Sequence, residues 1–362
     1  MMAPSKPNDL KDASAMESSR SRYWDSWKGI AIIAVVVIHS CASFTAFSPL
    51  SVNGISGLVL RQVVNFAVPL FFALSGYFAT STFGGDPIKF YRKRLGRIFW
   101  PYAVWTTIYL CIRALTDHVS AFSIVKGFMF GTGLGIGYFV IVLAQFIILT
   151  PLLASIKTSA GHIAAMLIGT AAGLSFTYSF PALRPEHPLS SFPFYALPFF
   201  AWYPFYHLGI YMARFRSQLL VANMGNRTAW AALCVAASVG VVESLYWQAG
   251  GSIRFATSQL KASNFIYAAL LFVAAIRFER NASLLHRSRT LAWLGNNSFA
   301  IYLIHMLFLG PIAAALSNIN ILFRAQPLFA LFCAAVTLCA SSALILILRR
   351  ILSRRAARMI LG

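Results

Sequence analysis

Ten mostly apolar stretches run along this chain, each of a length near that needed to cross a lipid bilayer as a helix. One crossing needs about 20 apolar residues, with a range of roughly 17 to 25. Of the 362 residues, 59% are hydrophobic and only 11% are charged, and the mean hydropathy is +0.70, which is outside the range of a soluble domain of this length. The stretches are 27–47, 63–80, 98–115, 136–155, 162–180, 194–213, 228–248, 263–277, 291–315 and 328–348.

These stretches predict an all-α, polytopic integral membrane protein with about ten transmembrane helices. Stretches 63–80 and 263–277 are short enough to be tilted or partly re-entrant, so nine or eleven crossings remain open.

The positive charges follow the predicted loops. The 30 Lys and Arg residues against 9 Asp and Glu give a net charge of +21, which could indicate nucleic-acid binding. Basic residues also collect in the cytoplasmic loops of membrane proteins, however. If the N-terminus is cytoplasmic, the outer segments hold few of them, namely Arg61, Arg113, Lys126, Arg184, Arg254, Lys261 and Arg324. Both termini are therefore predicted to be cytoplasmic, and no nucleic-acid partner is expected.

The two ends of the chain differ in composition from the middle. Residues 1–22 are polar and predict a flexible cytoplasmic tail, not a cleaved signal. Residues 23–349 are predicted to form the transmembrane domain, and residues 350–362 a basic cytoplasmic tail. The 5 cysteines show no CxxC spacing, so neither a disulfide framework nor a metal site is expected.

A histidine lies inside the first apolar stretch. His39 follows Trp27 by twelve residues, or about 18 Å at 1.5 Å per residue, which places it near the middle of a bilayer. Titratable groups inside membrane helices are costly and therefore favour a functional role. Lys28 precedes His39 by about three helical turns, so the two side chains share one helix face. The structural alternative is a neutral histidine that bonds to a neighbouring helix.

Two arginines stand just before the third apolar stretch. Arg94 and Arg97 are three residues apart, so they share a helix face and could form an anion site. Ordinary positive-inside anchoring is the alternative, and composition alone favours it. Anchoring is served equally well by lysine, whereas guanidinium groups suit phosphate oxygens, which makes a phosphorylated cytoplasmic ligand the sharper hypothesis.

Other polar residues are candidates for lining a cavity within the membrane. Tyr302 and His305 share a helix face, and His305 is predicted to lie at a depth similar to that of His39. Ser75 lies in a stretch where a helix-packing seam explains the pattern equally well. His207 is predicted to be structural. The candidate cavity-lining residues are Asp25, Ser75, Glu243, Tyr302 and His305.

Six segments carry motifs that occur in this order in one family of membrane proteins. They are RYWDSWKGIAIIAVVVIHS (22–40), VPLFFALSGYF (68–78), KRLGRIFWPY (93–102), GYFVIVLAQFIILTPLL (137–153), WYPFYHLGIYMAR (202–214) and SFAIYLIH (298–305). Over about residues 22–349 the chain resembles the membrane acyltransferase-3 family, bacterial O-acyltransferases that modify surface polysaccharides. It departs from many relatives in having Tyr138 and Phe139 where they have Trp-Phe, which puts the acceptor in doubt but not the fold.

The resemblance implies transfer of an acyl group, usually acetyl, from cytoplasmic acyl-coenzyme A to a sugar hydroxyl. His39 would be the essential histidine, and Lys28, Arg94 and Arg97 would bind the donor. Acyl-coenzyme A would be a co-substrate, and no tightly bound cofactor or metal is expected. The implied partners are a polysaccharide (exopolysaccharide, capsular polysaccharide or lipopolysaccharide), or its lipid-linked sugar precursor, and membrane lipid. The implied location is the bacterial inner membrane, with many passes.

Two other functions remain open from the sequence. A proton-coupled transporter could use His39, Glu243 and His305 as a proton relay. It predicts paired broken helices in two related halves, and the sequence shows no such repeat. A structural subunit without chemistry of its own leaves His39 unexplained. Acyl transfer explains the list best, because an activated thioester needs a base of near-neutral pKa and a cation site for the coenzyme phosphates.

Overall fold

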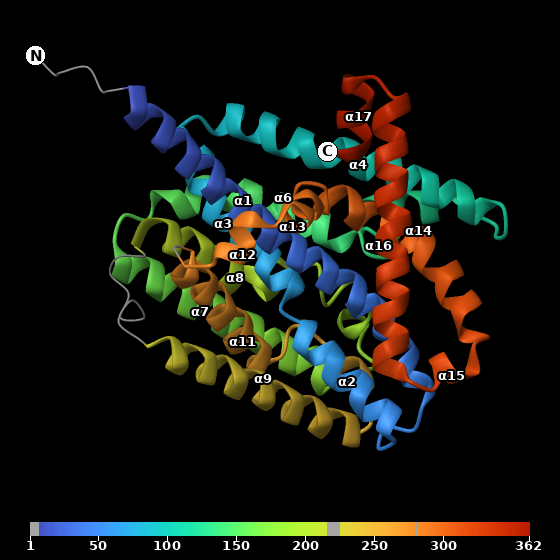
Figure 1. Ribbon diagram of the computed structural model, residues 1–362. Helices are drawn as coiled ribbons and strands as arrows, with labels where there is room; N and C mark the ends of the chain where they lie inside the picture. Colours follow the sequence, from blue (N-terminus) through green and yellow to red (C-terminus); the bar gives the residue numbers. More distant parts are fainter. Residues whose placement is uncertain (1–6, 216–224, 280) are drawn as a thin grey trace, which may run out of the picture.

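The computed structural model describes residues 7–215, 225–279 and 281–362, and within these residues it consists of helices and contains no strand (Figure 1). The all-α prediction is confirmed. The α-helices are α1 (Pro7–Ser40), α2 (Val52–Val64), α3 (Ala67–Thr82), α4 (Pro87–Ala114), α5 (Ala121–Met129), α6 (Tyr138–Ser155), α7 (Ser159–Thr177), α8 (Phe199–Phe215), α9 (Asn226–Ala249), α10 (Ile253–Ala256), α11 (Ala262–Phe278), α12 (Ser283–Arg287), α13 (Arg289–Asn296), α14 (Ser298–Ser317), α15 (Asn320–Phe323), α16 (Gln326–Ile351) and α17 (Arg354–Leu361).

Among the described residues, seven helical segments are long and apolar enough to cross a membrane. They are Ser21–Ala46, Val52–Ser81, Tyr138–Ser155, Ser159–Ala182, Asn226–Ala249, Ser298–Ser317 and Gln326–Ile351. Helix α11 is apolar but shorter. The predicted stretches 98–115 and 194–213 fall largely on α4 and α8. A polytopic membrane protein is thus confirmed, while the number of ten crossings and the cytoplasmic placement of the termini stay predictions.

The structure differs from the expected boundaries near both ends of the chain. Residues 7–22, expected as a flexible tail, continue helix α1, and Pro7 suits the first helical position; residues 1–6 lie outside the described part. Residues 354–361 of the expected basic tail form α17. This helix begins where the Ser353 side chain accepts a hydrogen bond from the Ala356 N–H at 3.3 Å, an N-cap that the sequence analysis missed.

The ninth predicted stretch, 291–315, is also not one continuous helix. It is divided between α13 and α14, which meet at Asn297. The Asn297 side-chain amide donates to the Trp293 carbonyl at 2.7 Å and closes the last turn of α13. Because α13 ends there, the start of the stretch packs along α1 as a separate amphipathic segment.

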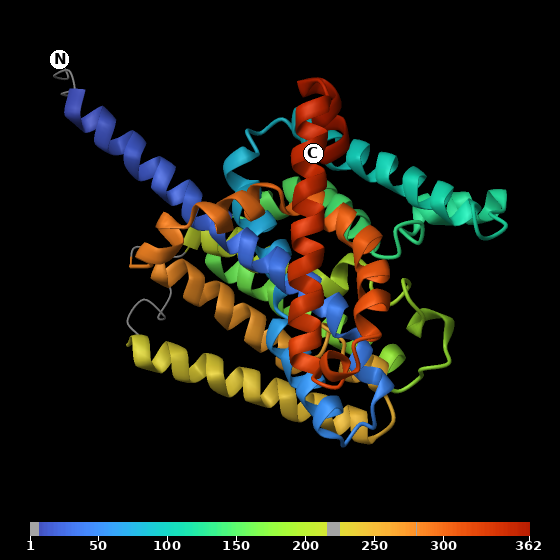
Figure 2. The same ribbon diagram turned by 45° about the vertical axis from the view of Figure 1, so that its right-hand side comes forward.

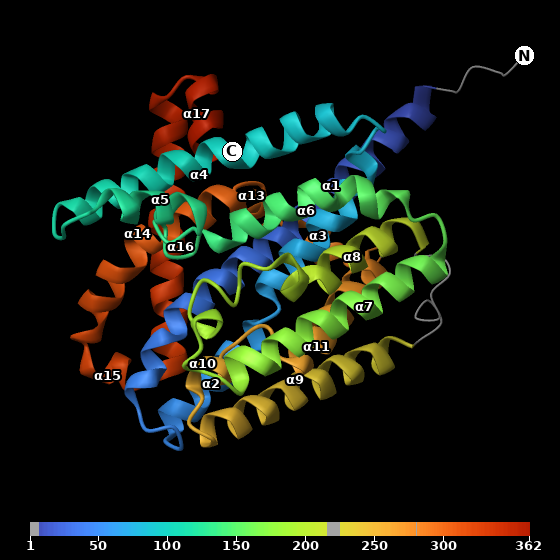
Figure 3. The same ribbon diagram turned by 180° about the vertical axis from the view of Figure 1, so that it is seen from behind.

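Helix α1 runs through the middle of the molecule and is enclosed by the later helices. Figures 1 and 3 show α6, α7, α8, α9 and α11 lying side by side, and Figure 2 shows α16 crossing α1 on another side. Helix α1 packs against α3, α13, α14 and α16. Its residues from Ala31 to Ile38 are almost all buried. The segment that carries Lys28 and His39 is therefore surrounded by protein.

Glycines allow α3 and α8 to approach with their backbones in contact. A Cβ atom on Gly209 would overlap the Ala73 carbonyl, and one on Gly76 would overlap the Tyr206 carbonyl. Small residues at such a crossing are typical of helix packing in membranes, where close backbone approach supplies the van der Waals contact. This contact fixes α3, which contributes Ser75 and Phe78 to the site described below.

We expect Gly209→Ala to destabilise the protein by about 1 to 3 kcal/mol, the usual cost of overpacking. Gly310→Ala is the matched control, since Gly310 is also inside a membrane helix but has nothing within 4 Å of the added Cβ. The control should be neutral or slightly more stable, because alanine is the better helix former. Thermal unfolding of both variants in detergent checks this, and equal melting temperatures would contradict the packing.

The predicted orientation has its own test, using exposed positions in a cysteine-free background. Ile88 and Leu284 are 71% and 83% exposed and lie in segments expected in the cytoplasm. Val52, 84% exposed, lies in a segment expected outside, and Leu115, 85% exposed, lies at the outer end of the predicted stretch 98–115. A membrane-impermeant thiol reagent applied to intact cells should label cysteines at Val52 and Leu115 and spare those at Ile88 and Leu284. The reverse labelling would invert the orientation.

Candidate functional site

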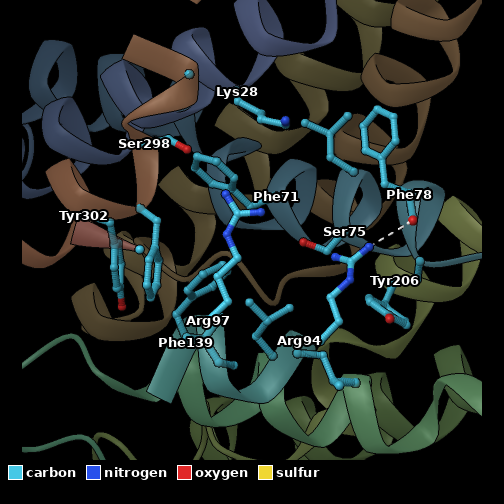
Figure 4. Close-up of a pocket in the computed structure, with 18 of the residues that line it drawn as sticks. Lys28, Phe71, Ser75, Phe78, Arg94, Arg97, Phe139, Tyr206, Ser298 and Tyr302 are labelled. Carbon is cyan, nitrogen blue, oxygen red and sulfur yellow. Dashed lines mark hydrogen bonds between the residues drawn. The ribbon is translucent and has the colours of Figure 1, made fainter. Parts of the chain in front are cut away.

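A cavity of about 450 Å³ lies between α1, α3, α4 and α14, with further lining residues from α6 and α17. We call it the central cavity (Figure 4). Its walls are mostly apolar, and a few polar side chains converge on it, as is common for small-molecule sites. The polar residues that line it and that the sequence also predicts are Lys28, Ser75, Arg94, Arg97 and Tyr302. Residues far apart in the chain are thus brought to one space.

The Lys28 amine forms an ion pair at the edge of the central cavity. Its Nζ lies 2.9 Å from Asp25 Oδ1, one helical turn earlier on α1. The same Nζ stands 5.4 Å from the centre of the Phe78 ring, close enough for a cation–π contact. Asp25 therefore acts on the cavity through Lys28, and it is not itself among the lining residues. Its candidate role as a cavity-lining residue stays a prediction.

The two arginines of α4 differ in their bonding. Figure 4 shows both guanidinium groups pointing from α4 into the central cavity. Arg94 is partly buried and donates from Nη2 to the Phe78 carbonyl at 3.1 Å, which ties α4 to α3. Arg97 is exposed and makes no hydrogen bond or ion pair with the described part of the chain. Arg97 is therefore the guanidinium that is better placed to bind a ligand, whereas Arg94 also has a structural task.

The electrostatics of this end of the cavity favour an anion. Burial is the main cause that lowers the pKa of the Arg94 guanidinium; the Tyr206 hydroxyl opposes the shift, and the positive charge of Arg97 adds to it. No acidic side chain lines the central cavity among the described residues. Two guanidinium groups and the Lys28 amine thus face this space, and their positive charge exceeds the negative charge of the Asp25 and Gly362 carboxylates beside it, which favours an anion.

His39 lies just beyond the deep end of the central cavity. Val35, one turn before His39 on α1, lines the cavity, and so does Tyr302, three residues before His305 on α14. The His39 and His305 rings face each other with centroids 5.4 Å apart. The two histidines therefore lie at one level, as expected, but neither is a wall residue of the cavity as described.

The two imidazoles have different hydrogen-bond partners. His305 is fully buried, and its Nδ1 lies 2.8 Å from the Tyr302 carbonyl, so Nδ1 carries a proton. Its Nε2 is buried and has no partner. His39 is partly exposed and makes no hydrogen bond with the described residues. Because its ring nitrogens are not held by a hydrogen bond to the described residues, His39 is the imidazole that is better placed to take a substrate proton.

The sequence analysis missed Arg61, which holds the backbone next to His39. Arg61 Nη1 donates to the Ile38 carbonyl at 2.6 Å, and Nε donates to the Thr257 carbonyl at 3.3 Å. A cation on the carbonyl at the end of α1 also suits the negative end of the helix dipole. The sequence signal was present, since Arg61 is a charge inside the candidate span Val52–Ser81, but the residue was assigned to an outer loop.

Glu243 lies at a different place from the histidines. Its carboxylate accepts a hydrogen bond from the Tyr178 hydroxyl and another from the Ser263 N–H at 3.1 Å. It does not line the central cavity, and its candidate role as a cavity-lining residue stays a prediction. No hydrogen bond among the described residues links Glu243 to His39 or His305. The hydrogen bonds of the described residues therefore do not connect the three groups that the transporter hypothesis needs.

His207 forms part of a buried chain of hydrogen bonds between α7 and α8. Its Nδ1 lies 2.8 Å from the Tyr203 hydroxyl, and its Nε2 lies 2.6 Å from His162 Nδ1. His162 Nε2 lies 3.2 Å from the Ile156 carbonyl, which can only accept. The donors therefore run from Tyr203 through His207 and His162 to Ile156. Each donor in this chain finds an acceptor when both imidazole rings are neutral, which agrees with the structural role predicted for His207.

Comparison with known proteins gives one family match and a similar bacterial protein. A family model described as an acyltransferase domain, that of the acyltransferase-3 proteins, matches residues 21–346. A Bacillus subtilis (strain 168) protein named "Putative membrane-bound acyltransferase YfiQ" is 24% identical over 292 residues, which cover 77% of this chain and 78% of that protein. No solved structure matches the chain.

Proposed function

The chain belongs to the acyltransferase-3 family and is a membrane acyltransferase, and from this premise we propose that it moves an acyl group, normally acetyl, from acyl-coenzyme A to a sugar hydroxyl. One observation carries the proposal. The central cavity has positive charge at its α4 end, where Arg97 makes no ion pair with the described residues, and an imidazole without a hydrogen bond to those residues, His39, lies one turn past its deep end. A donor with phosphates at one end and a thioester at the other matches this order.

In the proposed reaction the acceptor hydroxyl oxygen attacks the carbonyl carbon of the thioester. The hydroxyl proton passes to the His39 imidazole as the new C–O bond forms. The C–S bond breaks, its electron pair stays on sulfur, and the proton held by His39 can neutralise the departing thiolate. Since the thioester is already activated, atoms and charges balance without any further reactant.

Tyrosines near Arg61 support a sugar acceptor. Arg61 lies near Tyr138 and Tyr195, and all three side chains are partly exposed. The Phe192 ring packs edge-on against both tyrosines, with centroids 5.6 and 6.0 Å away. Aromatic faces with hydroxyl and guanidinium donors suit a sugar. The acceptor in this proposal is a surface polysaccharide, or its lipid-linked precursor, at the bacterial inner membrane.

Membranes that contain the protein provide the test. With [1-¹⁴C]acetyl-coenzyme A, they should transfer label to polysaccharide or lipid-linked sugar, and the label should be released by mild alkali as an ester. Membranes from cells without the gene are the control. Equal labelling in both membranes, or label retained as a protein amide, would contradict the proposal.

A further inference from the structure

A second, more open space of about 780 Å³ lies beside the central cavity, between α4 and α17. We call it the α4–α17 groove. Its cations are Lys93, Arg97, Arg354, Arg355 and Arg358, and the Trp100 indole also lines it. Among the described residues no acidic side chain lines the groove, and its five cations outnumber the terminal carboxylate of Gly362, which also lines it. Like charges so close together repel each other, so the arrangement favours a bound anion.

The groove continues into the central cavity. Lys93 and Arg97 line both spaces, and they stand one turn apart on the same face of α4. Trp100 follows Arg97 on that face and is 51% exposed. A ligand that lies along this face of α4 could therefore occupy the groove and the cavity together.

Apolar contacts and one hydrogen bond hold α17 in place with its arginines outward. Leu361 is buried, and the Trp105 indole N–H donates to the Ile360 carbonyl at 2.9 Å. Arg354 and Arg358, four residues apart, remain exposed on the groove side. Helix α17 is thus docked on α4, and its three arginines are free of any ion pair with the described residues.

We propose that the α4–α17 groove binds the nucleotide end of the acyl donor, the 3′-phosphorylated adenosine diphosphate of coenzyme A. This inference rests on the proposed function and extends it to residues outside the central cavity. The arginines would bind the phosphate oxygens, for which guanidinium forks are suited, and the adenine would stack on Trp100. The pantetheine arm would pass Arg97 into the central cavity and carry the thioester toward His39.

Anionic lipid headgroups offer the same phosphate chemistry, so the binding test uses nanodiscs of neutral phosphatidylcholine. Equilibrium dialysis of the full chain with labelled acetyl-coenzyme A gives the Kd. The triple variant Arg354→Gln, Arg355→Gln, Arg358→Gln should weaken binding by at least about tenfold, because hydrogen bonds to charged groups are lost. Trp100→Ala should weaken it further than Trp100→Phe, which keeps an aromatic face. Arg349→Gln with Arg350→Gln, exposed on α16 outside the groove, is the matched control.

Wild type should also prefer acetyl-coenzyme A to its 3′-dephospho form and to S-acetylpantetheine, which lacks the nucleotide. The triple variant should lose most of this preference, measured as the ratio of kcat/KM values, a readout that misfolding would not produce. An unchanged Kd and an unchanged preference would overturn the inference while leaving the proposed function standing. So would an effect of the triple variant that appears only with anionic lipid present. If wild type binds no acetyl-coenzyme A in any nanodisc, the proposed function fails as well.

Discussion

Replacing His39 with alanine should lower acyl transfer by about a hundredfold to ten-thousandfold, the usual contribution of a positioned acid-base group. The imidazole makes no hydrogen bond with the described residues, so its removal costs the ring contact with His305 but no hydrogen bond and should leave the fold intact. His39→Gln should be almost as inactive, because it keeps polarity and size but cannot carry the proton. Initial rates with labelled acetyl-coenzyme A in membranes with equal amounts of each protein measure the effect.

An exposed histidine provides the control for this experiment. His118 lies between α4 and α5, away from the central cavity, and His118→Ala should keep the wild-type rate. Donor binding should also survive His39→Ala, since the phosphates bind at the α4 end of the cavity. Near-normal transfer by His39→Gln would show that His39 is only a polar packing residue.

Removing the Arg97 side chain should weaken acyl-coenzyme A binding by about 1.5 to 3 kcal/mol, or roughly tenfold to more than a hundredfold. Arg97 faces both the central cavity and the α4–α17 groove and has no hydrogen-bond partner in the described chain. Its removal should therefore cost contacts with the ligand and not contacts within the protein. Arg97→Lys should restore only part of the affinity, because an ammonium group cannot make the paired bonds of a guanidinium. Equilibrium dialysis with labelled donor measures each Kd.

Variants of Arg94 and Arg92 serve as comparisons for Arg97→Ala. The Arg94 variant shows the effect of a residue that also stabilises the fold, and the Arg92 variant shows the effect of losing one positive charge outside the site. Arg94→Ala should weaken donor binding and also lower the melting temperature, because Arg94 bonds to the Phe78 carbonyl. Arg97→Ala should leave the melting temperature unchanged. Arg92 is an exposed neighbour that does not line the cavity, so Arg92→Ala removes one positive charge without altering the site. Equal weakening by Arg92→Ala and Arg97→Ala would mean that only the overall field matters.

The local regularity of a helix made part of the site predictable. Lys28 and Ser75, together with Arg94 and Arg97, were selected from the sequence and line one cavity. Their selection needed only the cost of polar groups within apolar stretches and the helical repeat, which decides which residues share a face. The same reasoning placed His39 and His305 at one level, and their rings lie 5.4 Å apart.

Helix ends and docked segments were predicted less well. The helix ends at Ser353 and Asn297 each depend on one side chain. Serine and asparagine are also common in polar loops, so these residues alone do not mark a helix end. Helix α17 was expected only as a basic tail, because nothing local reveals that Leu361 would be buried beside α4. For the same reason the α4–α17 groove could not be read from the sequence.

By itself the sequence determined that this is an all-helical membrane protein and which polar residues stand within its apolar stretches. Both follow from the thickness of a bilayer and the cost of placing polar groups in it. Only the tertiary structure decided the long-range partners. Arg61 bonds to the Ile38 carbonyl, and the fully buried Lys261, counted as an outer-loop charge, donates to Gln62 Oε1 at 2.9 Å. Such pairs depend on how helices distant in the chain pack, and that is set by the shapes of many side chains together.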